Sequence, residues 1–357
     1  EELAAEGFVP PQDVYFLSAC TEETDGAGAD AISRTLEARG VRPSLVLDEG
    51  GMILEAPIAG AKGLYAMVGV VEKGYADVKF TARSNGGHAS APKPHTPVGI
   101  LAKACCRVEN HPFKMRLTKP AREMFDTLGR HSTFLYRMIF ANLWCFGWVI
   151  DLLGKMSGGE MNALVRTTVA FTQMEGSSAR NVIPPEAKMV ANMRLNPSDS
   201  VESALDYLRK VIKDESVEVT ALESFEPSRI SETNCPAWDS VASAVEYLKA
   251  TVNDPSVEIE VLESNEPSRI SVADCDSYRK VAAAVEATWN GCITSPYLMV
   301  QCSDSRHYGV ISDKVYRFSA MDLTKEERGT IHGHNERVRV ECVHRAVEFY
   351  IRLMKKC

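Results

Sequence analysis

Two adjacent glutamates, Glu22 and Glu23, are the first residues along the chain that suggest chemistry. They come just after an apolar run, "VYFLSAC" (residues 14–20), whose β-branched and aromatic residues predict a buried strand. Carboxylates at the end of a strand can bind a metal cation, or accept a proton from a water molecule during hydrolysis. Glycines and a helical pattern follow the pair, however, and these also fit a different kind of site.

That second possibility is a dinucleotide-binding turn. Gly26, Gly28 and Ala31 fit the pattern G-x-G-x-x-A, and Asp48 lies 20 residues beyond Gly28 at the end of the next apolar run. In such turns the glycines begin at the end of the strand, so that the N–H groups of the helix meet the pyrophosphate. Here "TEETD" intervenes and would set three carboxylates against a polyanion. The sequence therefore favours a cation at this turn.

Other residues of the types that bind metal ions recur along the chain. Asp48 and Glu49 follow the next apolar run, and "IHGHNERV" (331–338) carries two histidines near the C-terminus. Each of these alone is more typical of an exposed acidic turn or a capping residue. Strand ends on one edge of a parallel sheet converge, however, and open α/β sheets bind their ligands in that crevice. Taken together, the residues predict a metal site at the carboxyl ends of the strands.

Six motifs, in order along the chain, resemble those of the zinc metallopeptidases that include aminoacylase, acetylornithine deacetylase and carboxypeptidase S. The resemblance extends essentially from end to end, and is strongest to the branch of carboxypeptidase S and the N-acyl-amino-acid hydrolases. The motifs are "TEETDGAGA" (21–29), "VLDEGG" (46–51), "GGHASAP" (86–92), "ARNVIPPEA" (179–187), "CSDSRHYG" (302–309) and "IHGHNERV" (331–338).

The resemblance implies a site with two zinc ions that share a bridging water molecule, with cobalt or manganese as alternatives in vitro. It assigns Glu22 as the general base and Glu23 as a ligand of one zinc ion. His332, the first histidine of H-x-x-N-E, joins Glu23 on that ion, and Asp48 binds the other. Two adjacent glutamates can divide these roles because the metal holds only one of them.

The resemblance assigns three further residues to the substrate. His88 corresponds to the histidine that stabilises the tetrahedral oxyanion, often across a dimer interface. Asn181 and Arg306 match positions that hold the carboxylate or carbonyl group of the substrate, and a planar guanidinium suits a carboxylate. Two of the three have a simpler alternative: His88 could bond within its own loop, and Arg306 could pair with Asp304.

The sequence departs from the family pattern near the first motif. Thr21 stands where family members usually have an aspartate before the glutamate pair. The family's first zinc histidine and its bridging aspartate precede the strand at Val14, and no other "H-x-D" or "DD" replaces them. We therefore expect the chain as given to bind at most one zinc ion weakly, and to have negligible amidase activity.

Two functions follow from these motifs. The first is a metal-dependent amidohydrolase or carboxypeptidase that cleaves N-acyl amino acids or small peptides and forms a homodimer through its lid. The alternative is a catalytically inactive relative that only dimerises or binds. A nucleotide-dependent oxidoreductase is a distant third.

The elements that must position these residues form an α/β fold: a mixed sheet flanked by helices, with an inserted α+β, ferredoxin-like lid or dimerisation domain. Strands and helices alternate at first, and strands of period two begin at Tyr75. The predicted units are the first part of the catalytic domain (1–74), the lid (75–235) with a helical insert near 120–160, a duplicated unit (236–280), and the second part of the catalytic domain (281–357).

The duplicated unit is visible as an internal repeat. The 28 residues from Ala204 and the 28 residues from Ala244 share 16 identical positions at an offset of 40. This identity indicates a tandem duplication of one helix–strand unit (204–231), and two copies are too few for a solenoid. We expect the second copy to lie at a sheet edge or to loop out.

Composition limits the classes of partner. The formal net charge is −8 and no dense basic run occurs, which argues against nucleic acid and anionic membranes. The apolar stretch "MIFANLWCFGWVI" (138–150) has 13 residues, fewer than the roughly 20 of a membrane span, and predicts a buried or interface helix. Ten scattered cysteines without a C-x-x-C pair favour a reducing compartment, so we expect a cytoplasmic protein.

Overall fold

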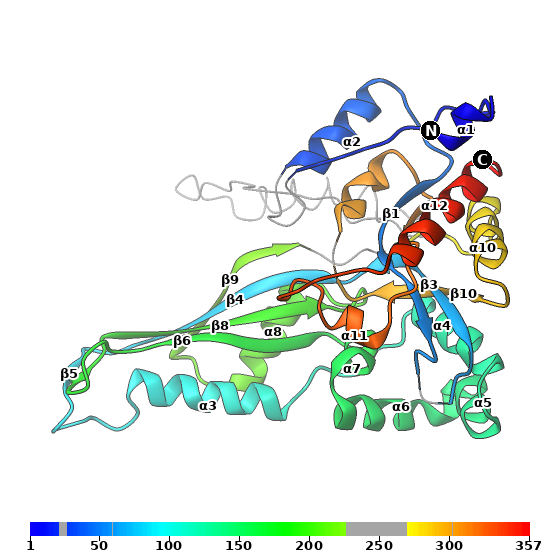
Figure 1. The fold of residues 1–357 in the computed structure, drawn as a ribbon. Helices are drawn as coiled ribbons and strands as arrows, with labels where there is room; N and C mark the ends of the chain where they lie inside the picture. The colour runs from blue at the N-terminus through cyan, green and yellow to red at the C-terminus, as the bar shows by residue number, and fades with distance from the viewer. Residues whose placement is uncertain (21–26, 59, 226–269, 302) are drawn as a thin grey trace, which may run out of the picture.

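The computed structural model describes residues 1–20, 27–58, 60–225, 270–301 and 303–357, and within these it has two larger sheets and a two-stranded ribbon (Figure 1). The first sheet is mixed and runs in the order β1-β11-β3-β10, with β2 paired to β3. β1 is parallel to β11 and β3 is parallel to β10, whereas β11 and β3 are antiparallel. Its strands are β1 (Val46–Gly51), β2 (Ile53–Glu55), β3 (Leu64–Glu72), β10 (Ile293–Met299) and β11 (Val315–Phe318).

β3 lies in the interior of this first body. All of its residues except Leu64 are buried, and they share one core with side chains of α4 (Lys119–Arg130), α10 (Asp276–Thr288) and α12 (Val340–Met354). A strand buried on both faces is a continuous apolar run rather than an alternating one, as "LYAMVGVV" is. β1 is at an edge of the sheet, with β11 as its neighbour.

The second sheet forms the lid. Its four antiparallel strands lie in the order β6-β8-β4-β9, and α3 (Pro97–Asn110) and α8 (Val201–Ile212) contribute to its core. Along the chain the lid reads strand, helix, strand, strand, helix, strand, which with this strand order is the ferredoxin-like arrangement. The predicted α/β fold with an α+β lid is confirmed. The strands are β4 (Gly74–Arg83), β6 (Thr168–Glu175), β8 (Glu186–Leu195) and β9 (Val217–Phe225).

Local sequence explains the lid elements. β4 and β8 alternate buried and partly exposed residues because one face packs on the helices. Thr96 caps α3, with its side chain accepting a hydrogen bond from the Gly99 N–H, and Ser200 forms a capping box with Ser203 at the start of α8. The first repeat copy is thus part of the lid as α8 and β9. Most of the second copy lies outside the described residues.

The helical insert packs against the first sheet rather than the lid sheet. α4 contacts β10, and Phe125, Leu128 and Phe140 belong to the core around β3. The segment 138–150, predicted to be helical, is helical except at Asn142. The chain forms α5 (Phe134–Ala141) and α6 (Leu143–Ser157), which meet at Asn142 with a bend of 113° and are followed by α7 (Gly159–Val165). No single helix in the described part is long and apolar enough to cross a membrane, and α5 and α6 reach that length only as a bent pair.

The predicted strand at 14–20 is also wrong. After α1 (Glu2–Ala5) this segment has no strand partner among the described residues, and Phe16 is 94% exposed. Only Leu17 packs, on the cluster that joins α2 (Gly28–Ala38) to β1. β-propensity describes how a side chain fits a pleated, half-buried surface, and it does not create a strand where no neighbouring strand is paired.

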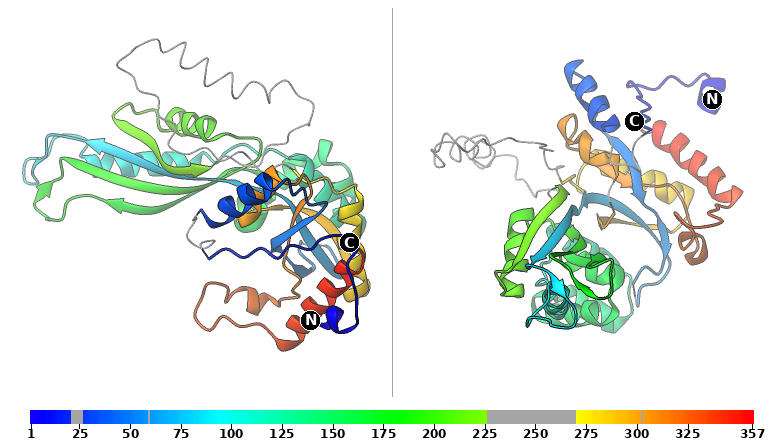
Figure 2. Two further views of the ribbon diagram at one scale, coloured as in Figure 1. Left: turned by 90° about the horizontal axis from the view of Figure 1, so that it is seen from above. Right: turned by 90° about the vertical axis from the view of Figure 1, so that its left-hand side faces the viewer.

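Short elements carry several of the candidate residues. β5 (Gly87–His88) and β7 (Val182–Ile183) form a ribbon at the far tip of the lid, which Figure 2 shows extending away from the first sheet. The 3₁₀ helix η2 (Asp304–Val310) packs against α2, β1 and β11. The short helix α11 (Lys325–Arg328) precedes the loop that leads into α12.

Candidate metal centre and lid tip

Asp48 lies on edge strand β1, in register with Arg317 of β11. The two glycines after it allow β1 to approach its neighbours closely. A Cβ on Gly50 would lie 2.8 Å from the Cβ of Arg317, and a Cβ on Gly51 would overlap the carbonyl oxygen of Met67. Real Cβ atoms do not come this close, so the motif "VLDEGG" needs both glycines at this crossing. The motif therefore fixes where the Asp48 carboxylate lies.

The Asp48 carboxylate is short of hydrogen-bond partners. Its Oδ2 is buried, and no described residue donates a hydrogen bond to it. Burial raises the pKa of Asp48 above its usual value, and the nearby Glu72 and Asp304 raise it further, whereas a backbone hydrogen bond and Arg317 act in the opposite direction. A buried acceptor without a partner is costly for a folded chain. Such an oxygen is suited to a bound cation.

A buried ionic network lies beside Asp48. Arg317 is fully buried, and its Nε donates to Glu72 Oε1 at 2.9 Å and to Ser305 Oγ at 2.6 Å. The Ser303 and Ser305 hydroxyls also donate to Glu72 Oε1, at 2.8 and 2.5 Å. Glu72 is thus bound on one oxygen by three donors. Sequence reasoning missed these residues. The available signal was a glutamate that ends one apolar strand and an arginine within another.

Arg306 extends from η2, the element that carries Ser305 and Tyr308. Its Nη1 donates to the carbonyl oxygen of Ser303 at 3.1 Å, and the side chain is partly exposed. Burial raises the pKa of Tyr308, with Asp48 and Asp304 adding to the shift. η2 therefore brings Arg306, Tyr308 and Asp304 to the same end of the first sheet as Asp48.

His88 and Asn181 come together at the lid tip, far from β1 (Figure 1). His88 pairs with Val182 in the β5–β7 ribbon, and the N–H of Ala89 donates to the carbonyl oxygen of Asn181 at 2.9 Å. The N–H of Ser90 donates to His88 Nδ1 at 3.2 Å, and the Ser90 hydroxyl lies 2.7 Å from the same nitrogen. Because Nδ1 accepts, the proton of the neutral ring is on Nε2. The exposed ring therefore offers an N–H donor.

His332 lies on the exposed loop between α11 and α12. Its backbone has φ +57°, and its N–H donates to the carboxylate of Glu336 at 3.1 Å. Asn335 also has a positive φ of +61°. Left-handed backbone is uncommon for residues other than glycine, and where it persists it points to a functional constraint. The H-x-x-N-E motif is thus a loop tied together by its own glutamate.

The described residues do not test the predicted ligand set as a whole. Glu22 and Glu23 lie outside the described residues. Within the described ranges, no three His, Cys, Asp or Glu side chains are grouped so as to hold a metal ion. The chemistry of Asp48 nevertheless fits a divalent cation, because none of the described residues donates to its buried Oδ2. For His332, on its exposed loop, no comparable observation among the described residues points to a cation.

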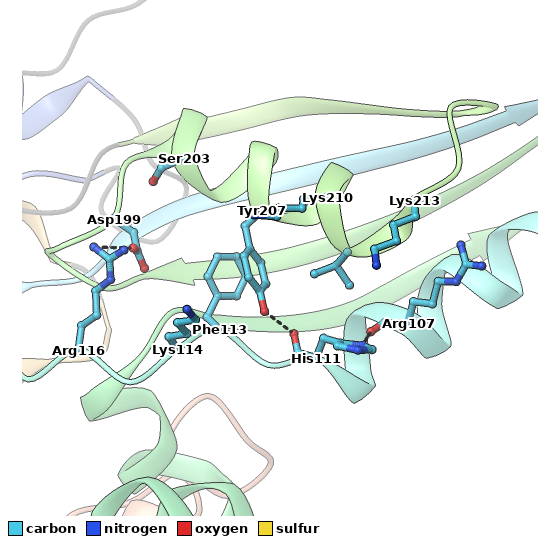
Figure 3. A pocket seen from close by; sticks show the side chains of 11 residues that line it. Arg107, His111, Phe113, Lys114, Arg116, Asp199, Ser203, Tyr207, Lys210 and Lys213 are labelled. Atoms are coloured by element: carbon cyan, nitrogen blue, oxygen red, sulfur yellow. Dashed lines mark hydrogen bonds and ion pairs between the residues drawn. The ribbon is translucent and has the colours of Figure 1, made fainter. Parts of the chain in front are cut away.

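A separate pocket of about 630 Å³ lies in the lid between α3 and α8 (Figure 3). Phe113 and Tyr207 stack in it with ring centroids 4.3 Å apart, and the Tyr207 hydroxyl donates to the His111 carbonyl oxygen at 3.2 Å. Asp199, the acidic residue of the lining, accepts from Thr167 at 2.5 Å and pairs with Arg116 at 3.5 Å. The pocket is therefore strongly basic. Its cationic side chains are Arg107, Lys114, Arg116, Lys210 and Lys213.

Residues 70–220 match the family model of the peptidase dimerisation domain of M20 peptidases. The whole chain is 32% identical to the N-fatty-acyl-amino acid synthase/hydrolase PM20D1 of Xenopus tropicalis, over 99% of this chain and 62% of that protein. The chain is thus similar to an N-fatty-acyl-amino acid synthase/hydrolase over its whole length, and residues 70–220 match an M20 peptidase dimerisation domain. The predicted resemblance to the aminoacylase and carboxypeptidase S family is therefore confirmed.

Two further proteins are similar to this chain. A probable carboxypeptidase S-like protein 2 of Dictyostelium discoideum is 28% identical over 99% of this chain and 61% of its own length. The solved M20 family metallo-carboxypeptidase Sso-CP2 of Sulfolobus solfataricus has the same fold, with a TM-score of 0.53 at 12% identity, over 92% of this chain and 66% of that one. The chain thus spans about 62% of the first curated relatives' length.

Proposed function

We propose that the protein is a metal-dependent amidohydrolase that cleaves the amide bond of N-acyl amino acids or small peptides with a free carboxylate. The observation that carries this proposal is the buried Oδ2 of Asp48, without a donor among the described residues, at an open sheet edge beside η2. Support for the substrate class comes from a relative named as an N-fatty-acyl-amino acid synthase/hydrolase. Other relatives named as carboxypeptidases support the free carboxylate.

Asp48, Glu23 and His332 would hold zinc in this proposal, with two zinc ions in a complete site. Bound zinc lowers the pKa of a coordinated water molecule towards about 7 and polarises a scissile carbonyl group. Asp48 suits the role of ligand because its raised pKa reflects burial and two neighbouring carboxylates. A bound cation would relieve each of these costs.

The remaining residues divide the other tasks. Glu22 takes the proton of the attacking water and passes it to the leaving nitrogen. His88 donates its Nε2–H to the developing oxyanion, a role consistent with Nδ1 being held by Ser90. Arg306 and Asn181 hold the carboxylate or carbonyl group of the substrate, and the Arg306 guanidinium offers two parallel donors for a carboxylate.

The second candidate function is binding without turnover. It is favoured by the absence of a three-ligand group from the described part of the chain, since a catalytic zinc ion normally has three protein ligands. A family member of this kind would still dimerise through the lid. The two functions differ in their response to zinc and substrate.

The test is hydrolysis of N-acyl amino acids by the full-length protein, with zinc content measured in parallel. Glu22→Gln should lower kcat by roughly 10²–10⁴-fold and leave the zinc content unchanged. Glu37→Gln, at an exposed site on α2, is the matched control and should retain full activity. Zinc binding or substrate binding without any hydrolysis by the unaltered protein would favour the second candidate.

A further inference from the structure

The outer side of the helical insert carries a stripe of large apolar side chains. On α6 the stripe recurs every four residues, at Trp144, Trp148, Leu152 and Met156, with Trp144 87% and Met156 76% exposed. This spacing puts the side chains on one face of the helix. Phe134 and Leu135 continue the apolar surface on α5. We call these six residues the α5–α6 elbow.

The inner sides of α5 and α6 pack against the rest of the protein. Ile150 and Phe140 are buried in the core around β3. The buried guanidinium of Arg166 bonds to Asp151 of α6 at 2.5 Å and to the carbonyl oxygen of Phe113 at 3.0 Å. α6 is thus apolar on its inner and outer sides and fixed in place. Helices of this kind occur inside proteins or in contact with membranes, and soluble surfaces rarely keep such a patch bare.

The charge of this region is opposite to that of the chain. Residues 113–166 contain eight lysines and arginines against four acidic residues, a net charge of +4, whereas the whole chain carries −8. Arg137, on α5, makes no ion pair with any described residue. The expectation of no anionic membrane rested on the net charge of the whole sequence, which hides this local excess of positive charge.

The basic pocket adjoins the elbow. Lys114 and Arg116 line the pocket (Figure 3). Between them in sequence, the Met115 methyl group lies 3.5 Å from the position of a Cβ on Gly147 of α6. Figures 1 and 2 both place α3, which borders the pocket, on the same side of the molecule as α6. Apolar and cationic surfaces therefore meet on one side of the protein.

We propose that the α5–α6 elbow binds the surface of an anionic phospholipid membrane, with the basic pocket facing lipid phosphates. Tryptophan is favoured at the level of the lipid headgroups, where its ring is half apolar and half polar. Interfacial helices bind by combining buried apolar area with lysine and arginine attracted to anionic lipids. A second copy of this chain fits less well, because a two-fold contact would set this positively charged region against itself.

The test is co-sedimentation of the protein with vesicles of phosphatidylcholine and phosphatidylserine, compared with phosphatidylcholine alone. Binding should be stronger to the anionic vesicles and should weaken as salt is added. Replacing both tryptophans, Trp144→Ser with Trp148→Ser, should weaken binding at least about tenfold, since two large apolar side chains no longer enter the lipid. The matched control is Val340→Ser with Val343→Ser, two exposed apolar residues on α12, which should bind as the unaltered protein does.

Two further measurements separate the possible occupants of the elbow. Brominated lipids should quench the tryptophan fluorescence of the unaltered protein, and most of that quenching should be lost in the double tryptophan variant. Sedimentation velocity without lipid should give the same oligomeric state for both proteins. No binding of the unaltered protein to anionic vesicles would overturn the proposal. A dimer that the tryptophan replacements dissociate, without lipid binding, would assign the elbow to a second copy and would overturn it too.

Discussion

Asp48 shows how a site residue opposes stability at the scale of one side chain. Burial and two neighbouring carboxylates raise its pKa, so the folded state holds the Asp48 proton more tightly than the unfolded state. The stabilising contribution of Asp48 is therefore complete below the unfolded pKa and is lost as pH rises through the folded pKa. At neutral pH an ionised Asp48 costs stability unless a cation is bound.

The first prediction is a reversal in the effect of Asp48→Asn. In EDTA the variant should melt higher than the unaltered protein, by roughly 2 °C or more, because a buried charge is removed. With zinc added, the unaltered protein should gain stability and the variant should gain little. Thermal unfolding of both proteins under both conditions is the measurement. An Asp48→Asn variant that responds to zinc as strongly as the unaltered protein would remove Asp48 from the metal site.

Single residues also show what sequence reasoning could reach. Asp48 and Arg306 belong to short motifs, and both motifs lie at the same end of the first sheet. Glu72 and Arg317 belong to no recognised motif, yet their buried pair with Ser303 and Ser305 surrounds that end of the sheet. Strand pairing across 245 residues brings them together, and no local pattern predicts a contact at such a separation.

At the scale of elements, Lys73 connects the first sheet to the lid. It is the single residue between β3 of the first sheet and β4 of the lid, and its side chain is fully buried. Its Nζ donates to the carbonyl oxygens of Ala163 at 2.9 Å and Arg166 at 2.7 Å, at the end of α7. Burial lowers the pKa of Lys73 to about 7, and Arg194 contributes to the shift.

The second prediction follows from this lowered pKa. Between about pH 7 and 10.5 the unfolded chain binds the Lys73 proton and the folded chain does not, so this group makes stability rise with pH across that window. Lys73→Met should remove this part of the slope. The measurement is the free energy of unfolding in urea at pH 6.5, 8 and 9.5. Lys62→Met, at an exposed lysine, is the control and should keep the slope of the unaltered protein. Equal slopes in Lys73→Met and the unaltered protein would contradict the assignment.

Helices and strands were predicted well where the hydrophobic period extends over many residues. They were predicted poorly where contacts with other elements determine the structure of a segment. The period-two strand expected from Tyr75 is present as β4, and the helical insert expected near 120–160 is present as α4 to α7. Residues 14–20 have strand composition but no paired neighbour among the described residues, and residues 138–150 break into two helices at Asn142. Composition describes what a segment can form, whereas the partner and the bend depend on the rest of the fold.

At the scale of the whole molecule, the candidate residues lie far apart, some at the first sheet and some on the lid. His88 and Asn181 lie at the lid tip, and Asp48 lies in the first sheet at the other end of β4 (Figure 1). β4 has ten residues, and a strand of that length spans roughly 33 Å. His88 therefore does not reach Asp48 of its own chain in this arrangement. A lid that dimerises could bring His88 to the metal centre of a second chain.

The third prediction tests whether two chains share a site. Glu22→Gln and His88→Ala should each be inactive alone as homodimers. Random mixing puts both variant chains into half of the dimers. If His88 serves the partner's metal centre, each of these mixed dimers has one intact site. Mixing through a dissociated state should then recover about a quarter of the activity of the unaltered protein. The control is Glu22→Gln mixed with the unaltered protein, with mixed dimers counted by native mass spectrometry. Mixed dimers that form in the expected proportion and stay inactive would place His88 in its own subunit's site or outside catalysis. To deliver His88 to its own subunit's site, the lid would need to fold back by roughly its full length.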